Sequence, residues 1–288
     1  MRDYSNDQRA VMTLDAGGTN FVFSAIQANQ AVVQSFSLPA DAADLEKSLG
    51  NMFQGFQRVL DSLASPPAAI SFSFPAPADY FNGIIVGPRN LPAYKNVPLA
   101  AILEDRFSLP VFINNDGDLF TFGEAASGLL PHVNGLLAQA GSPKRFRNLF
   151  GVTLGTGLGG GIVRDGELYT GDNSLAGEIW ILRHKLNPEL NAEEGASIRA
   201  VRRVYAELSN ITFDEAPEPK VIFEIAKGLA EGNAYAAREA FRRMGEIAGD
   251  AIANASTLLD ALVVIGGGVS GAAASGGAAP QGGGEPGH

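Results

Sequence analysis

Apolar and polar residues follow two periods along the first third of the chain: alternation, which is typical of strands, and helical spacing. From residue 45 to residue 63 the apolar positions recur at helical spacing, and Pro66 and Pro67 end the predicted helix. Strands are predicted in AVMTLDAGGTNFVFSAIQ (10–27, two strands around a glycine turn), AVVQSFSLPA (31–40), AAISFSFPAP (68–77) and the start of GIIVGPRNLPAYKNVPL (83–99), which continues into a proline-rich loop.

The remaining two thirds repeat this alternation of strand and helix patterns. Helices dominate the prediction for residues 193–258. The other predicted elements are a short helix in PLAAILEDRF (98–107), a buried strand in LPVFINN (109–115), a helix in DLFTFGEAASGLL (118–130), strands and tight turns in NLFGVTLGTGLGGGIVRDGELYTG (148–171), and a last buried strand in ALVVIGGGVSG (261–271).

Two halves of the chain therefore each begin with a β-hairpin that carries a glycine-rich turn. Strands interleaved with helices predict an α/β fold. We expect an N-terminal domain of residues 1–116 and a C-terminal domain of residues 117–271. The remaining segment, 272–288, is rich in glycine and alanine and has almost nothing to bury, so we expect it to be a disordered tail.

Composition narrows the function classes. The chain has 288 residues, 45% of them hydrophobic, and a net charge of −10 with no block of lysine and arginine, so we expect no nucleic-acid partner. It has no cysteine and three histidines, so we expect no zinc site. The N-terminus is polar and no apolar run approaches the roughly 20 residues of a membrane span, so we expect a cytoplasmic protein without a membrane partner.

Three glycine loops follow apolar strands: DAGGTN (15–20), GTGLGGG (155–161) and GGGVSG (266–271). Glycine permits positive φ and lets backbone amides approach an anion closely. One such loop is explained equally well by a tight hairpin turn. Three of them favour phosphate binding.

Two familiar nucleotide motifs do not fit these loops. The chain has no Walker A sequence. The letters G-x-G-x-x-G occur at Gly155 and at Gly266, but a dinucleotide fingerprint needs a helix immediately afterwards. A hairpin sequence follows the first occurrence and the low-complexity tail follows the second, which argues against a nicotinamide-dependent oxidoreductase.

Taken together, five motifs in this order resemble the ROK family of the hexokinase and actin-like ATPase superfamily, from about Asp15 to Gly271. The motifs that carry the resemblance are Asp15-Ala16-Gly17-Gly18-Thr19-Asn20, Asn115-Asp116, Gly155-Thr156-Gly157, Ala176-Gly177-Glu178-Ile179 and Val264-Ile265-Gly266-Gly267-Gly268. The resemblance implies two actin-like, ribonuclease H-like domains around a cleft. It also implies an ATP- and Mg²⁺-dependent sugar kinase. Only 14 residues precede Asp15, so we expect no DNA-binding helix-turn-helix.

The family implies a role for each motif. Asp116 would be the general base that accepts the proton of a sugar hydroxyl, and Asp15 would be a water-mediated partner of Mg²⁺. Sugar contacts are implied for Asn90, Asn115, Glu178 and Glu194. ATP contacts are implied for Gly17, Gly18, Thr19, Asn20, Gly155, Thr156, Gly157, Gly266, Gly267 and Gly268.

Simpler interpretations exist for several of these residues. Asn115 and Asp116 also fit a helix N-cap, and we assign Asp118 mainly to that role. Asn90 also fits a turn in the proline-rich loop. Glu193 competes with Glu194 as the sugar contact, and either fits the first turn of a helix.

The chain departs from the family pattern in one motif. Many members have Gly-His after the Glu-Ile pair, whereas Trp180 and Ile181 stand here. We expect Trp180 to lie in the core, with a role in shaping the sugar pocket as the alternative. We expect His184 to be a histidine with ordinary hydrogen-bond partners and no sugar role. This departure, and the unusual tail, leave a non-enzymatic sugar or nucleotide sensor as the alternative to a kinase. Family members often form homodimers, but no residue here marks an interface.

Overall fold

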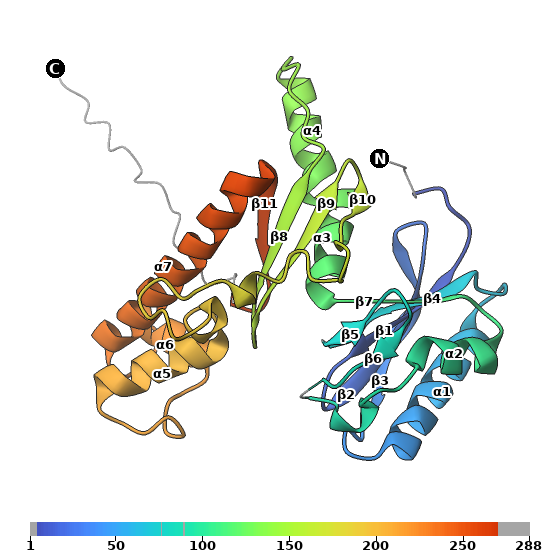
Figure 1. The fold of residues 1–288 in the computed structure, drawn as a ribbon, viewed down its shortest axis with the longest axis horizontal. Helices are drawn as coiled ribbons and strands as arrows, with labels where there is room; N and C mark the ends of the chain where they lie inside the picture. Colours follow the sequence, from blue (N-terminus) through green and yellow to red (C-terminus); the bar gives the residue numbers. More distant parts are fainter. Residues whose placement is uncertain (1–4, 76, 89, 270–288) are drawn as a thin grey trace. The chain divides into compact units, whose positions relative to one another are not determined.

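The computed structural model describes residues 5–75, 77–88 and 90–269 (Figure 1). The chain separates into two compact units. Unit 1 comprises the chain up to Phe150 together with Gly161–Gly177, and unit 2 comprises Gly151–Gly160 together with the chain from Glu178 onward. The predicted domain boundary after residue 116 stays a prediction. The predicted tail, 272–288, lies outside the described residues.

The elements run in the following order along the chain. The strands are β1 (Val11–Ala16), β2 (Asn20–Gln27), β3 (Gln30–Pro39), β4 (Ala69–Ser73), β5 (Ala78–Asp79), β6 (Ile84–Ile85), β7 (Val111–Asn114), β8 (Leu149–Leu154), β9 (Leu158–Arg164), β10 (Glu167–Leu168) and β11 (Leu262–Gly266). The α-helices are α1 (Leu45–Ser62), α2 (Leu99–Phe107), α3 (Asp116–Ala126), α4 (Leu129–Gln139), α5 (Ile198–Ser209), α6 (Pro219–Ala226) and α7 (Ala234–Leu259). The 3₁₀ helices are η1 (Pro92–Tyr94), η2 (Ile179–Ile181) and η3 (Ala192–Glu194).

Unit 1 is built on a five-stranded sheet in the order β3-β2-β1-β4-β7. The strands β1, β2 and β3 form an antiparallel meander, whereas β4 and β7 run parallel to β1. The aromatic core joins this sheet to α1: the ring of Phe23 stacks on Phe36 at 5.6 Å and meets Phe56 edge-on at 5.3 Å between centroids. Burial of such rings supplies most of the driving force for docking a helix on a sheet.

A second sheet has the order β10-β9-β8-β11, and β8 and β9 form the second predicted hairpin. In unit 2, α5, α6 and α7 pack on one another. The α/β class is therefore confirmed, and so are both glycine-turn hairpins and the helical segment at 193–258. The last strand forms as predicted but is not buried: β11 lies at the edge of its sheet, its residues are half-buried, and Ile265 is exposed.

One predicted helix is two helices. The pattern at 118–130 predicts continuous helix, but α3 ends at Ala126 and α4 begins at Leu129. Ser127 and Gly128 have non-helical backbone angles, and the carboxylate of Glu124 turns back to accept the amide of Leu129 at 2.8 Å. Helical spacing alone does not report such a break, because the apolar positions continue across it.

The contact between α1 and the sheet gives a paired stability test. A methyl group at Gly55 would overlap the ring of Phe23, whereas a methyl group at Gly50, in the same helix, meets nothing within 4 Å. We expect Gly55→Ala to lower the free energy of unfolding by about 1–3 kcal/mol. Gly50→Ala should raise it by about 0.5–1 kcal/mol, because alanine favours a helix interior. Urea unfolding measures the stability of both variants. Equal effects of the two substitutions would contradict the close packing of Gly55 against Phe23.

Candidate active site

The parallel strands of unit 1 bring two predicted motifs to one edge of the sheet. Asp15 lies opposite Ser73, and Ser73 lies opposite Asn114, across β1, β4 and β7. The amide of Phe74 continues this alignment by donating to the carbonyl of Asn114 at 3.0 Å. The carboxyl ends of β1 and β7, which precede the glycine turn and Asn115, therefore share an edge, where ligands of α/β sheets bind.

The glycine turn between β1 and β2 is tight and touches a third motif. The amide of Gly17 donates to the carbonyl of Asn20 at 3.1 Å, which closes the turn. Gly18 packs against Asn90, since a Cβ at this position would lie 3.0 Å from the carbonyl oxygen of Asn90. Thr19 and Asn90 are exposed. The structure thus brings the first glycine turn and Asn90 together.

Asn115 and Asp116 begin helix α3. Asn115 is the N-cap, and its side-chain oxygen accepts the amide of Gly117 at 2.7 Å. Asp116 is exposed, and its Oδ1 accepts the same amide at 2.9 Å. The prediction that Asp118 caps the helix is wrong: Asp118 lies inside the first turn and is 6% exposed. Asn115 takes the cap because its backbone is extended, as an N-cap requires.

Gly161 has a role that the sequence analysis missed. A Cβ there would lie 2.6 Å from the carbonyl oxygen of Gly117 and 2.7 Å from Oγ1 of Thr121. Glycine therefore lets β9 approach the first turn of α3, at the residues that follow Asp116. The sequence offers the signal, the last glycine of the 155–161 loop, but not the partner.

Unit 2 brings together the other two glycine loops. The amide of Gly155 donates to the carbonyl of Gly157 at 3.0 Å, and Thr156 at the tip is exposed. Gly267 has φ +92°, and a Cβ there would overlap the backbone of Leu154. The amide of Val269 also donates to Leu154, at 3.1 Å. The loop at 266–268 is thus anchored to the residue that precedes the Gly155–Gly157 turn.

The predicted sugar-contacting carboxylates lie on η2, η3 and their flanks, which are tied together by the 2.7 Å bond from the amide of Ala192 to the carbonyl of Leu182. Glu194 points to Arg203, at 2.7 Å. Its competitor, Glu193, reaches the glycine turn, because its Oε2 accepts the amide of Leu158 at 3.2 Å. The carboxylate next to the turn is therefore Glu193.

The environment of Trp180 differs from the prediction. The side chain is 36% exposed rather than in the core, and its indole N–H donates to Oε2 of Glu178. The residue that replaces glycine in the motif therefore binds the motif's own carboxylate. His184 is a satisfied histidine, as predicted: its Nδ1 accepts the amides of Leu186 and Asn187 at 3.2 and 3.1 Å.

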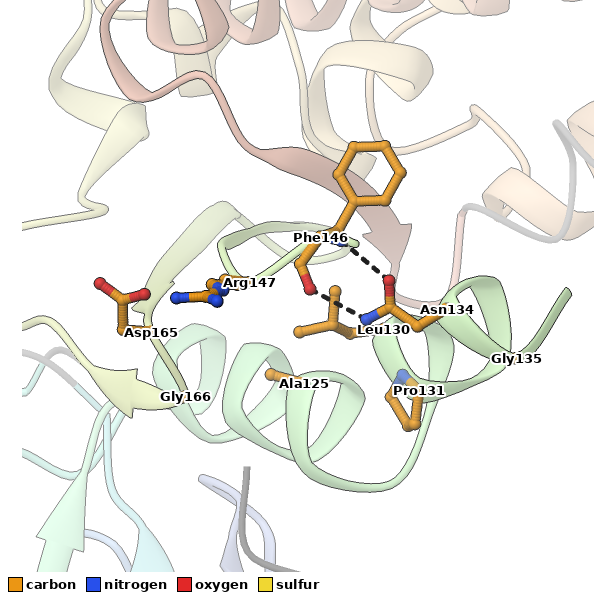
Figure 2. Close-up of a pocket in the computed structure, with 9 residues that line it drawn as sticks. All are labelled: Ala125, Leu130, Pro131, Asn134, Gly135, Phe146, Arg147, Asp165 and Gly166. Atoms are coloured by element: carbon orange, nitrogen blue, oxygen red, sulfur yellow. Dashed lines mark hydrogen bonds between the residues drawn. The ribbon is translucent and has the colours of Figure 1, made fainter. Parts of the chain in front are cut away.

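A separate cavity of about 700 Å³ lies within unit 1. Figure 2 shows the residues that line it. Asn134 builds one wall by bonding both backbone groups of Phe146, at 2.9 and 2.8 Å. Leu130 lies beside them, and Arg147 and Asp165 lie at the other side of the view. The cavity is lined by none of the residues that the motifs predict.

None of the helices in the described part of the chain combines the length and the hydropathy that a membrane-spanning helix needs.

The chain is similar to known proteins in both sequence and fold. The model of the ROK family matches residues 11–275. The crystal structure of a glucokinase from Parabacteroides distasonis is 55% identical, with a TM-score of 0.87 over 95% of this chain and 77% of that one. A crystal structure of a ROK family glucokinase from Streptomyces griseus, in complex with glucose and AMPPNP, is 22% identical with a TM-score of 0.67, over 91% of this chain and 84% of that one; it shows the shared fold.

A curated relative, the N-acetyl-D-glucosamine kinase of Vibrio cholerae, is 29% identical over 186 residues. This match covers 64% of the chain and 56% of the relative, so it spans little more than half of that protein.

The anchoring of the 266–268 loop can be tested by paired substitutions. Gly267→Ala should lower the free energy of unfolding by about 1–3 kcal/mol, because a side chain is strained at φ +92° and overlaps Leu154. Gly268→Ala meets nothing within 4 Å and should change stability by less than about 0.5 kcal/mol. Urea unfolding of both variants measures these changes in stability. A Gly267→Ala protein as stable as the parent would show that the loop is not anchored on Leu154.

Proposed function

The chain belongs to the ROK family, and we propose that it is an ATP-dependent sugar kinase, which transfers the γ-phosphoryl group of ATP to a hydroxyl of a hexose or N-acetylhexosamine. The observation that carries this proposal is the shared sheet edge at which Asp116 follows β7 and the glycine turn follows β1. Relatives that are named glucokinase and N-acetyl-D-glucosamine kinase support the same chemistry and leave the choice of sugar between these classes.

We assign the general base to Asp116. Its Oδ1 is occupied by the amide of Gly117, and no donor among the described residues bonds to Oδ2. A sugar hydroxyl at Oδ2 would give its proton to this carboxylate while the hydroxyl oxygen forms a bond to the γ-phosphorus and the bond to the β–γ bridging oxygen breaks. ADP leaves with the electron pair of that broken bond.

The glycine turns suit a nucleotide. In the described part of the chain, the amides of Gly18, Thr19 and Thr156 have no acceptor, so these turns present N–H groups that phosphate oxygens can use. Asp15 is an exposed carboxylate at the end of β1, and oxygen ligands of this kind suit Mg²⁺, directly or through water. When bound, Mg-ATP supplies the phosphoryl group, and the metal neutralises its charge.

The remaining parts of the assignment follow the family. Asn90, Asn115, Glu178 and Glu194 stay the proposed sugar contacts, and we add Glu193 because its carboxylate lies against the Gly155–Gly157 turn. The loop at 266–268 is the proposed adenosine contact. A homodimer and a cytoplasmic location are further proposals that rest on the resemblance alone.

The test is ADP release with Mg-ATP across a panel of hexoses and N-acetylhexosamines. We expect turnover with at least one sugar, and a loss of about 10²–10⁴-fold in Asp116→Asn, because the amide cannot accept the proton. Asp165→Asn is the matched control: this exposed aspartate lies in the turn between β9 and β10 at φ 51°, a conformation that asparagine also tolerates. It should keep full activity.

Two outcomes would count against the proposal. Asp116→Asn with undiminished turnover would remove Asp116 as the base. Tight binding of sugar and ATP without turnover in the parent protein would favour the alternative, a sensor of the same fold.

A further inference from the structure

An arginine joins two neighbouring carboxylates beside the Gly155–Gly157 turn. Nη2 of Arg199 donates to Oε1 of Glu193 at 2.9 Å and to Oε1 of Glu194 at 3.3 Å. Arg203 holds the other oxygen of Glu194 at 2.7 Å. Two guanidinium groups thus balance two adjacent negative charges, and Arg199 is the one that touches both.

The network ends on the glycine turn. Oε2 of Glu193 accepts the amide of Leu158, the first residue of β9, at 3.2 Å. Gly157 leaves the space that this carboxylate occupies, since a Cβ there would overlap Oε2 of Glu193. On the other side of the turn, the carbonyl of Gly155 accepts the amide of Ile198 at 2.9 Å. The start of α5 therefore holds the turn twice, once through its backbone and once through Arg199 and Glu193.

The burial of this pair makes it more than a surface contact. The side chains of Arg199 and Glu193 are 35% and 25% exposed, so water and salt screen them less than a fully exposed pair. Hydrogen bonds between ionised groups are also stronger and more directional than neutral ones. Arg199 can therefore fix where the Glu193 carboxylate lies.

We propose that Arg199 is a positioning residue, which holds Glu193 against the Gly155–Gly157 turn so that the phosphate turn and the sugar-contacting carboxylates of η3 move as one piece. The proposal rests on the kinase function proposed above. Arg199 itself contacts neither sugar nor phosphate in this account. Arg199 affects the binding of sugar and phosphate only by holding Glu193 in place.

Kinetics of Arg199→Met test the proposal. We expect kcat/KM for the preferred sugar to fall roughly 10- to 100-fold, as for the loss of a charged hydrogen bond, with KM rising for both sugar and ATP. A partly misfolded protein would instead lower apparent kcat and leave both KM values unchanged. Arg199→Lys, which keeps the charge and a donor without the planar fork, should recover part of the loss.

The matched control is Arg202→Met on the same helix. Arg202 bonds the carbonyl of Ala216 at 2.9 Å, away from η3, so this variant should stay within about twofold of the parent in both KM values. A double-mutant cycle adds a second readout. Because Arg199 acts through Glu193, the effects of Arg199→Met and Glu193→Gln should overlap rather than add. Additive effects, or an Arg199→Met enzyme that matches Arg202→Met, would overturn the proposal.

Hydrogen exchange of the Leu158 amide tests the contact without any turnover. When Arg199 is replaced, Glu193 is released and this amide should exchange faster, while amides in the middle of α5 keep their protection. Exchange at Leu158 equal to that of the parent would overturn the positioning role. If the parent protein phosphorylates no sugar, the kinase proposal fails, and this exchange measurement alone decides the role of Arg199.

Discussion

The parallel pairing of β1, β4 and β7 is the constraint on which the first half of the site depends. It aligns Asp15, Ser73 and Asn114 in one register, so residues that are a hundred positions apart in the sequence end at the same edge. Parallel pairing requires crossover connections, and α1 and α2 supply them while burying the apolar face of the sheet. The backbone, rather than a particular side chain, thus sets the spacing between a proposed phosphate turn and a proposed base.

In unit 2 the corresponding constraint is close backbone approach. Gly267 can lie close to the backbone of Leu154 only because glycine has no side chain. For the same reason, Gly157 leaves room for the carboxylate of Glu193. The two loops and the carboxylate therefore form one packed cluster. Chemistry that needs precise placement benefits from this arrangement, since a displacement of about 1 Å can cost a hundredfold in rate.

Much of the fold could be predicted from the sequence, because periodicity and glycine placement are local signals. The helix at 45–63, the two glycine-turn hairpins and the strand before Asn115 follow from them. The break at Gly128 could not, and the choice of Asn115 over Asp116 and Asp118 as the helix cap could not either, because both depend on backbone angles and on side chains that fold back. Trp180 was misplaced for a similar reason: its apolar character predicted the core, but its indole N–H has a carboxylate partner two residues away.

The choice between Glu193 and Glu194 shows the same limit at the site. Adjacent glutamates are equivalent in a pattern, and only the fold shows that one meets the amide of Leu158 while the other meets Arg203. The motifs predicted which segments carry the chemistry. The structure adds which atoms of those segments meet within each unit.

In the proposed reaction, this chain moves a phosphoryl group from ATP to a sugar. Phosphorus NMR of the protein with Mg-ATP and glucose, and then with N-acetylglucosamine, observes that transfer directly. We expect a sugar phosphate resonance that grows in step with ADP. ADP accompanied by inorganic phosphate alone, or unchanged ATP with every sugar tried, would contradict it.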